Sequence, residues 1–192
     1  MKKIIIFIIL FLTNISNIGA EEIKRIFVGN KDAKITIIAF ESLTCSHCAN
    51  FHKDVYPELK KEYLDTGLAK IEFRHFPLDI AAFNASKVSQ CNNDGDSNIL
   101  NSLFANQQKW VKGNSIEEAN KNLQKFLVSE GYNLDFEKCI NDKEIEDFVL
   151  NDRIDGVKKF KVNATPTIII NNKKFKKSLN YKNLKKSIEK LI

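Results

Sequence analysis

The sequence predicts an α/β fold that is interrupted by an all-helical insertion. Two β-rich segments, 35–40 and 69–78, are separated by one helical pattern, which is typical of a strand–helix–strand unit with a parallel sheet. Strand patterns then disappear, and β character returns only near the C-terminus. We therefore predict a sheet domain of residues 21–78 and 156–192 that encloses an insertion domain of residues 79–155.

The composition is that of an ordinary globular protein. Of the 192 residues, 43% are hydrophobic and 28% are charged, which excludes a disordered chain, a collagen-like repeat and a coiled-coil rod. The formal net charge of +6 is a mild bias. We expect the lysines between residues 173 and 186 to form a solvated face, and we expect no nucleic-acid binding.

The first twenty residues have the layout of a secretory signal peptide. Lys2 and Lys3 precede an unbroken apolar run, 4–12, and a more polar stretch ends in two small residues. As a helix the run spans only about 13 Å, against roughly 30 Å of bilayer hydrocarbon. We predict export to the periplasm after removal of residues 1–20; the alternative is a permanent membrane anchor. Export favours disulfides over zinc as the use of the four cysteines.

The first strand and helix surround the main motif. Residues 35–40 are nearly all apolar and predict a strand that is buried on both faces. The helix that follows has apolar residues every three to four positions, at Cys48, Phe51, Val55, Leu59 and Tyr63. Pro57 should kink this helix, and Gly67 should end it. Residues 69–78 then alternate and predict the second strand.

The predicted insertion consists of helices. Its expected segments are 81–91, 99–111, a helix that ends near Gly131, 136–140 and 145–154. Ser115 and Glu118 have the spacing of a capping box at the start of the third segment. Trp110 should belong to the core of the insertion.

The C-terminal part should complete the sheet. Residues 162–170 predict a strand, and Asn171-Asn172 predicts a turn into a hairpin partner at 173–175. A final helix is expected over 181–192, with the apolar residues Leu184, Ile188 and Leu191 on one side.

The chemistry is concentrated in Cys45-Ser46-His47-Cys48, where a predicted strand leads into a helix. Free N–H groups and the dipole at a helix N-terminus favour an anion, so Cys45 should ionise readily. His47 can stabilise the thiolate further, as an imidazolium or as an N–H donor. Cys48 lies one turn along and can close a disulfide with Cys45. A stabilised thiolate favours the reduced protein, at about 1.4 kcal/mol or 30 mV per pKa unit, and so makes the disulfide a stronger oxidant.

Other uses of this motif fit less well. Zinc needs two further ligands, but Cys91 and Cys139 are far apart in the sequence. Haem attachment needs a histidine directly after the second cysteine, where Ala49 stands. An inert structural disulfide is a further alternative. We expect no metal and no cofactor, and we interpret His52 and His75 as packing or surface residues.

Three segments carry a resemblance to a known family. They are 37–59 with its C-S-H-C and V-Y-P-E-L, 71–78 with I-E-F-R-H-F-P-L, and 162–167 with V-N-A-T-P-T. The chain resembles the thioredoxin-fold periplasmic disulfide oxidoreductases of the DsbA type. The resemblance implies a thioredoxin fold with a helical insertion. It also implies that Pro166 is cis, and that Thr165 and Pro166 face the two cysteines and dock an extended substrate chain.

The resemblance implies further features. Some relatives carry a second bridge, which here would be Cys91–Cys139; the alternative is two buried free thiols. Many oxidases of this type have proline where Ser46 stands, which leaves the oxidising strength open. The family often has a buried acid behind the active site. Glu41 is the nearest candidate, although the residues alone favour a solvated loop carboxylate.

We therefore predict a monomeric thiol oxidase that donates disulfides to reduced, unfolded exported proteins. The resemblance implies that a membrane quinone reductase of the DsbB type reoxidises it. The alternative is a disulfide isomerase or reductase. Thr165, directly before Pro166, and Ser46, which is not proline, are compatible with this alternative. A binding module or holdase without redox activity is a hypothesis of a different class.

Overall fold

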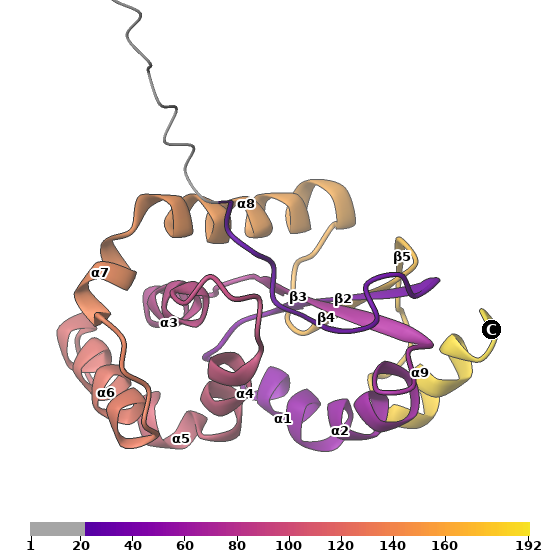
Figure 1. Ribbon diagram of the computed structural model, residues 1–192, viewed down its shortest axis with the longest axis horizontal. Helices are drawn as coiled ribbons and strands as arrows, with labels where there is room; N and C mark the ends of the chain where they lie inside the picture. The colour runs from indigo at the N-terminus through magenta and orange to yellow at the C-terminus, as the bar shows by residue number, and fades with distance from the viewer. Residues whose placement is uncertain (1–21) are drawn as a thin grey trace, which may run out of the picture.

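The computed structural model describes residues 22–192, so the predicted signal peptide lies outside the described residues. The described chain forms a five-stranded sheet with helices on both faces (Figure 1). The strand order is β1-β3-β2-β4-β5. The strands are β1 (Phe27–Gly29), β2 (Ile35–Glu41), β3 (Ala69–His75), β4 (Thr167–Ile170) and β5 (Lys173–Lys174). The predicted α/β fold class is confirmed.

The centre of the sheet is the predicted strand–helix–strand unit. β2 and β3 pair in parallel, with Ile37 opposite Ile71. β4 pairs antiparallel with the other side of β2, and β5 pairs antiparallel with β4. The sequence interpretation missed β1, which pairs antiparallel with β3. A strand of three residues is too short to show an alternating pattern.

Two helical layers bury the central strands. α1 (Ser46–Asp54), α2 (Tyr56–Leu59) and α9 (Tyr181–Ile188) lie on one face, and α8 (Lys143–Phe160) lies on the other (Figure 1). Alternate residues of β2 point to the two layers: Ile37 and Ala39 belong to the larger core, and Ile38 and Phe40 to the core under α8. This is why the strand is almost continuously apolar.

The helix after β2 is interrupted earlier than the sequence predicts. The break lies at Val55, where φ is −120°, and α2 is followed by a π-helical turn over Lys60–Leu64. Pro57 lies in the first turn of α2, where its missing N–H costs no helical hydrogen bond. Gly67, with φ of +76°, lies in the turn before β3.

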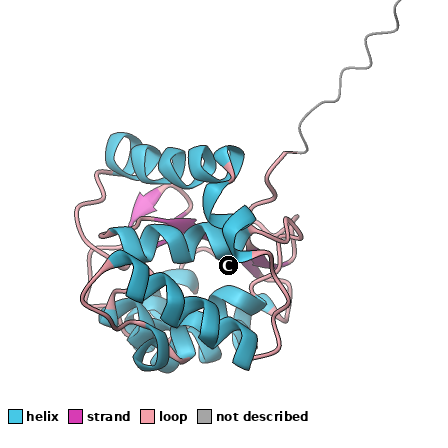
Figure 2. Cartoon of the chain, turned by 90° about the vertical axis from the view of Figure 1, so that its left-hand side faces the viewer, coloured by secondary structure: helices cyan, strands magenta, loops and turns pink. Residues whose placement is uncertain are grey.

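The insertion is all-helical, as predicted (Figure 2). Its helices before α8 are α3 (Ile80–Gln90), α4 (Asn98–Ala105), α5 (Gln107–Trp110), α6 (Ile116–Ser129) and α7 (Phe136–Asn141). The single helix predicted over 99–111 is wrong, because the chain breaks at Asn106 into α4 and α5. Trp110 is buried as predicted, and its indole N–H donates to the Leu103 carbonyl at 2.9 Å.

Two helix ends differ in detail from the sequence patterns. The Ser115 hydroxyl caps α6 by accepting from the Glu118 N–H, but the Glu118 carboxylate accepts from the N–H of Asn114, one residue before the cap. α8 runs on to Phe160, so residue 155, the expected domain boundary, lies inside a helix.

The strand predicted over 162–170 begins only at Thr167. The residues before it form a loop that contains a cis peptide bond between Thr165 and Pro166. α9 ends at Ile188, so Leu191 lies beyond the helix and is 47% exposed, against the prediction. None of the described helices is both long and apolar enough to cross a bilayer.

Candidate active site

Cys45 is the residue that caps the N-terminus of α1. Its backbone is extended (φ −78°, ψ 118°), and its carbonyl accepts hydrogen bonds from the N–H groups of Cys48 and Ala49. Its side chain makes no capping bond, so Sγ lies beside the first-turn N–H groups of the helix. Cys45 and Cys48 are both free thiols in the structure.

The surroundings of Cys45 favour its thiolate. A hydrogen bond from the Cys48 side chain lowers the pKa of Cys45 most, burial opposes this, and Thr165 and the backbone N–H groups of Cys48 and His47 lower the pKa further. Together they bring the pKa from 9.0 to about 5. Cys45 should therefore be ionised at neutral pH.

Cys48 has the opposite environment. Its side chain is fully buried, and burial is the main cause that raises the pKa of its thiol. The hydrogen bond to Cys45 and the charge of Glu41 raise this pKa further. At neutral pH the pair is therefore one thiolate and one thiol.

His47 follows Cys45 by two residues at the start of α1. Its side chain is exposed, and its backbone N–H is one of the groups that lower the pKa of Cys45. The ring lines a groove of about 540 Å³ that also includes Thr165, Pro166 and Tyr181.

Thr165 reaches the site from the far end of the chain. The Cys45 thiol donates to the Thr165 carbonyl over 3.4 Å, across 120 positions in the sequence. The Thr165 hydroxyl is buried without a hydrogen-bond partner among the described residues, so it is free to donate to a thiolate. The structure thus brings Thr165 to Cys45, and Pro166 follows it across a cis peptide bond.

Glu41 is not the solvated carboxylate that the residues alone favour. The residue is 3% exposed at the end of β2, and its Oε2 lies 2.9 Å from Nε2 of His52. The His52 ring stacks on Phe104 with 4.1 Å between ring centroids, so His52 is a packing residue, as expected. The sequence analysis did not predict the bond between His52 and Glu41. The four-residue spacing between Cys48 and His52 does place these two residues on one face of α1.

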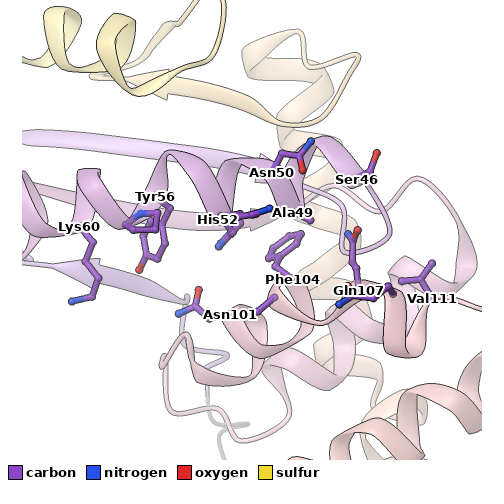
Figure 3. A pocket seen from close by; sticks show the side chains of 14 residues that line it. Ser46, Ala49, Asn50, His52, Tyr56, Lys60, Asn101, Phe104, Gln107 and Val111 are labelled. Atoms are coloured by element: carbon purple, nitrogen blue, oxygen red, sulfur yellow. The ribbon is translucent and has the colours of Figure 1, made fainter.

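A larger groove lies on the insertion side of α1. Its volume is about 790 Å³, and α1, α2, α4 and α5 line it (Figure 3). Gln107 stands at its edge and donates from Nε2 to the carbonyls of Leu43 (2.7 Å) and Cys45 (3.0 Å). The sequence contains no signal for this role, because a glutamine in a short helix is usually a surface residue.

The remaining cysteines lie apart from the site. Cys91, directly after α3, and Cys139 in α7 form a disulfide within the insertion. The described residues contain no cluster of three or more histidine, cysteine or acidic side chains that could hold a metal ion.

The chain is similar in sequence and fold to known proteins. Residues 21–190 match the family described as Thioredoxin. The crystal structure of alpha-DsbA1 from Wolbachia pipientis is 31% identical, with a TM-score of 0.77 over 87% of this chain and 90% of that one. The oxidised BdbD structure from Bacillus subtilis is 25% identical, with a TM-score of 0.70 over 86% and 91% of the two chains.

A relative known from its sequence is the putative protein-disulfide oxidoreductase of Rickettsia bellii (strain RML369-C). It is 30% identical over 148 residues, which are 75% of this chain and 56% of the relative. The chain therefore spans a little over half the length of that protein. From the match over residues 21–190 and the likeness to alpha-DsbA1, the chain belongs to the thioredoxin family and, within it, to the DsbA-type proteins.

Proposed function

We propose that the chain is an exported thiol:disulfide oxidoreductase that donates the Cys45–Cys48 disulfide to newly translocated proteins. The observation that carries this proposal is the unequal environment of the two sulfurs. Cys45 lies at the helix end beside Thr165, with its thiolate stabilised, while Cys48 is buried and keeps its proton. A pair that is stable when reduced gives up its disulfide readily.

The reaction has two exchange steps. A substrate thiolate attacks Sγ of Cys45; the Cys45–Cys48 bond breaks, and Cys48 keeps the electron pair and takes up a proton. A second substrate thiolate then attacks the substrate sulfur of the mixed disulfide, and Cys45 leaves as a thiolate. The substrate gains a disulfide, and the enzyme leaves reduced by two electrons.

The loop that contains Thr165 and Pro166 is the proposed binding place for the substrate. These residues and His47 line one groove beside Cys45, where an extended chain can align its backbone. His47, when protonated, would add positive charge near the thiolate. Reduced, unfolded exported proteins are the proposed substrates, and a membrane quinone reductase of the DsbB type is the proposed oxidant of the reduced enzyme.

The test is oxidation of a reduced, unfolded protein by the purified, oxidised chain. Cys45→Ser should abolish disulfide formation, whereas Cys91→Ala/Cys139→Ala, outside the site, should retain it. A Cys45→Ser variant with full activity would contradict the proposal.

A disulfide isomerase or reductase remains the second candidate, because Ser46 stands where many oxidases have proline. Refolding of a substrate with scrambled disulfides separates the two activities. An oxidase should add disulfides quickly but correct wrong ones slowly.

A further inference from the structure

The positive charge of this protein is concentrated in its C-terminal part. Residues 156–192 contain eleven lysines and a single acidic residue, Glu189, whereas residues 22–155 contain more acidic than basic side chains. The formal net charge of the whole chain is only +6, so the overall composition does not show this asymmetry. We call the surface formed by the lysines of residues 156–192 the lysine face.

These lysines lie at one end of the molecule. The C-terminal end of α8, β5 and α9 are neighbours there (Figure 1). Nζ of Lys174 in β5 donates to the carbonyl of Lys161, directly after α8, at 3.1 Å. In α9, Lys182 and Lys186 are one turn apart and both exposed. The lysine face therefore extends from the end of α8 across the last strand of the sheet to α9.

Most charges of the lysine face are not neutralised within the protein. Lys159 pairs with Asp155, and Lys185 pairs with Glu62 and Glu189. The other nine lysines of this face form no ion pair with the described residues. A surface with unpaired charges of one sign creates a potential that attracts anions.

Protection of the sheet edge does not account for so many lysines. Lysines on an edge strand prevent it from pairing with another chain. Only Lys173 and Lys174 belong to β5, however, and the remaining lysines of the face lie on helices and loops. These further charges therefore suit an anionic partner.

Exposed apolar side chains at the same end favour a membrane over other anionic partners. Leu191 and Ile192, directly after Lys190, are 47% and 69% exposed. Lysines beside exposed apolar side chains are typical of surfaces that lie on an anionic bilayer, because the charges contact the headgroups and the apolar groups enter the interface. A nucleic acid would use only the charges.

We propose that the lysine face docks the protein on the surface of a bilayer that contains anionic phospholipids. The lysines contact the lipid phosphates, and Leu191 and Ile192 enter the interface. The groove beside Cys45 reaches this face, because Tyr181 lines the groove and Lys182 is the next residue. Docking thus keeps Cys45 near the membrane surface. The inference goes beyond the proposed function, since docking needs no redox step.

The test measures binding of the purified protein to lipid vesicles by sedimentation. Vesicles of phosphatidylglycerol and phosphatidylcholine in equal amounts are compared with vesicles of phosphatidylcholine alone. At about 0.1 M salt the mixed vesicles should bind at least about tenfold more tightly, because several lysines contact the anionic headgroups. At about 1 M salt this difference should disappear, since the screening length falls from about 10 Å to about 3 Å.

Lys182→Gln/Lys186→Gln is the variant that tests the lysine face. A lysine near an anionic surface contributes about fivefold to binding, or about 1 kcal/mol, so the double variant should bind mixed vesicles about 25-fold more weakly. Lys121→Gln/Lys125→Gln is the matched control, since both lysines are exposed, have the same spacing in α6 and lie outside the face. Its binding should stay within about twofold of wild type, because charges far from the bilayer are screened.

Equal binding to both kinds of vesicle, or equal weakening by the two double variants, would overturn the proposal. Tighter binding to polyglutamate or to a DNA oligonucleotide than to mixed vesicles would also overturn it, because the partner would then be a polyanion of another class. Cys45→Ser should abolish the proposed disulfide donation but bind vesicles as wild type does. The docking proposal and the proposed function can therefore fail separately.

Discussion

Two sulfur atoms one helical turn apart have opposite environments in this protein. Cys45 lies at the open end of α1, where hydrogen bonds lower the pKa of its thiol to about 5, and Cys48 lies beneath it in the core. The helix end alone contributes only about 0.3–1 kcal/mol to an anion. The larger effects come from the Cys48 side chain and from Thr165, which add to the backbone N–H groups.

The low pKa of Cys45 predicts a pH-dependent stability of the reduced protein. A depressed pKa stabilises the folded state fully above the ordinary pKa of 9.0, and this contribution is lost as the pH falls through about 5. The oxidised protein has no titrating Cys45. The melting temperature of the reduced form, measured relative to that of the oxidised form, should therefore fall as the pH is lowered from about 8 to about 5.

Calorimetry of both forms across this range measures the difference. The other titrating groups are the same in both forms, so their contributions to the difference in melting temperature largely cancel. A difference that does not change with pH would contradict the stabilised thiolate, and a clearly more stable oxidised form at neutral pH would argue against a strong oxidant.

Among the elements, α5 has a larger role than its four residues imply. Gln107 joins the insertion to the loop that precedes α1, through the carbonyls of Leu43 and Cys45. The break at Asn106 changes the direction of the chain between α4 and α5. In a continuous helix over 99–111, the side chain of Gln107 would point in another direction. The insertion thus helps to hold the segment from which the thiolate is presented.

We predict that Gln107→Ala lowers the free energy of unfolding by about 1–3 kcal/mol, because two partly buried carbonyls lose their donor. Urea denaturation measures the change. Gln108→Ala is the control, since the neighbouring side chain is exposed, and it should cost less than about 0.5 kcal/mol. Equal midpoints for the two variants would show that the contact adds nothing to stability.

At the scale of the whole molecule, contacts between distant segments join its parts. The Asp152 carboxylate of α8 accepts from Arg25 at 2.8 and 3.0 Å and from the backbone N–H of His75 at 3.0 Å. This links the segment before β1, the end of β3 and the long helix. Burial and the charge of Arg25 lower the pKa of His75 to about 3, so its ring stays neutral here.

The disulfide joins segments 48 residues apart within the insertion. By restricting the unfolded chain it should contribute about 2–4 kcal/mol. Cys91→Ala/Cys139→Ala should lower the free energy of unfolding by this amount and leave the titration of Cys45 unchanged. When reductant opens the bridge in wild type, the difference between the two proteins should nearly disappear. Equal stability of both proteins under oxidising conditions would contradict this prediction.

Sequence patterns determined those features that depend on neighbouring residues. The apolar run of β2, the C-x-x-C at the start of α1 and the helical spacing of the insertion are local, and each was predicted near its observed position. The patterns did not predict the three-residue β1, the break at Asn106 or the late start of β4, because packing against other elements decides them.

Only the tertiary structure decided the chemistry around the two sulfurs. The sequence alone identifies Cys45 and Cys48, and the resemblance adds Thr165. Neither shows that Glu41 is buried against His52, or that Gln107 holds the carbonyl of Cys45. These contacts join residues on different elements, and a local pattern carries no information about which side chains meet when the elements pack. Hydrogen bonding and burial set the charge of a thiol, so its reactivity is a property of the folded molecule.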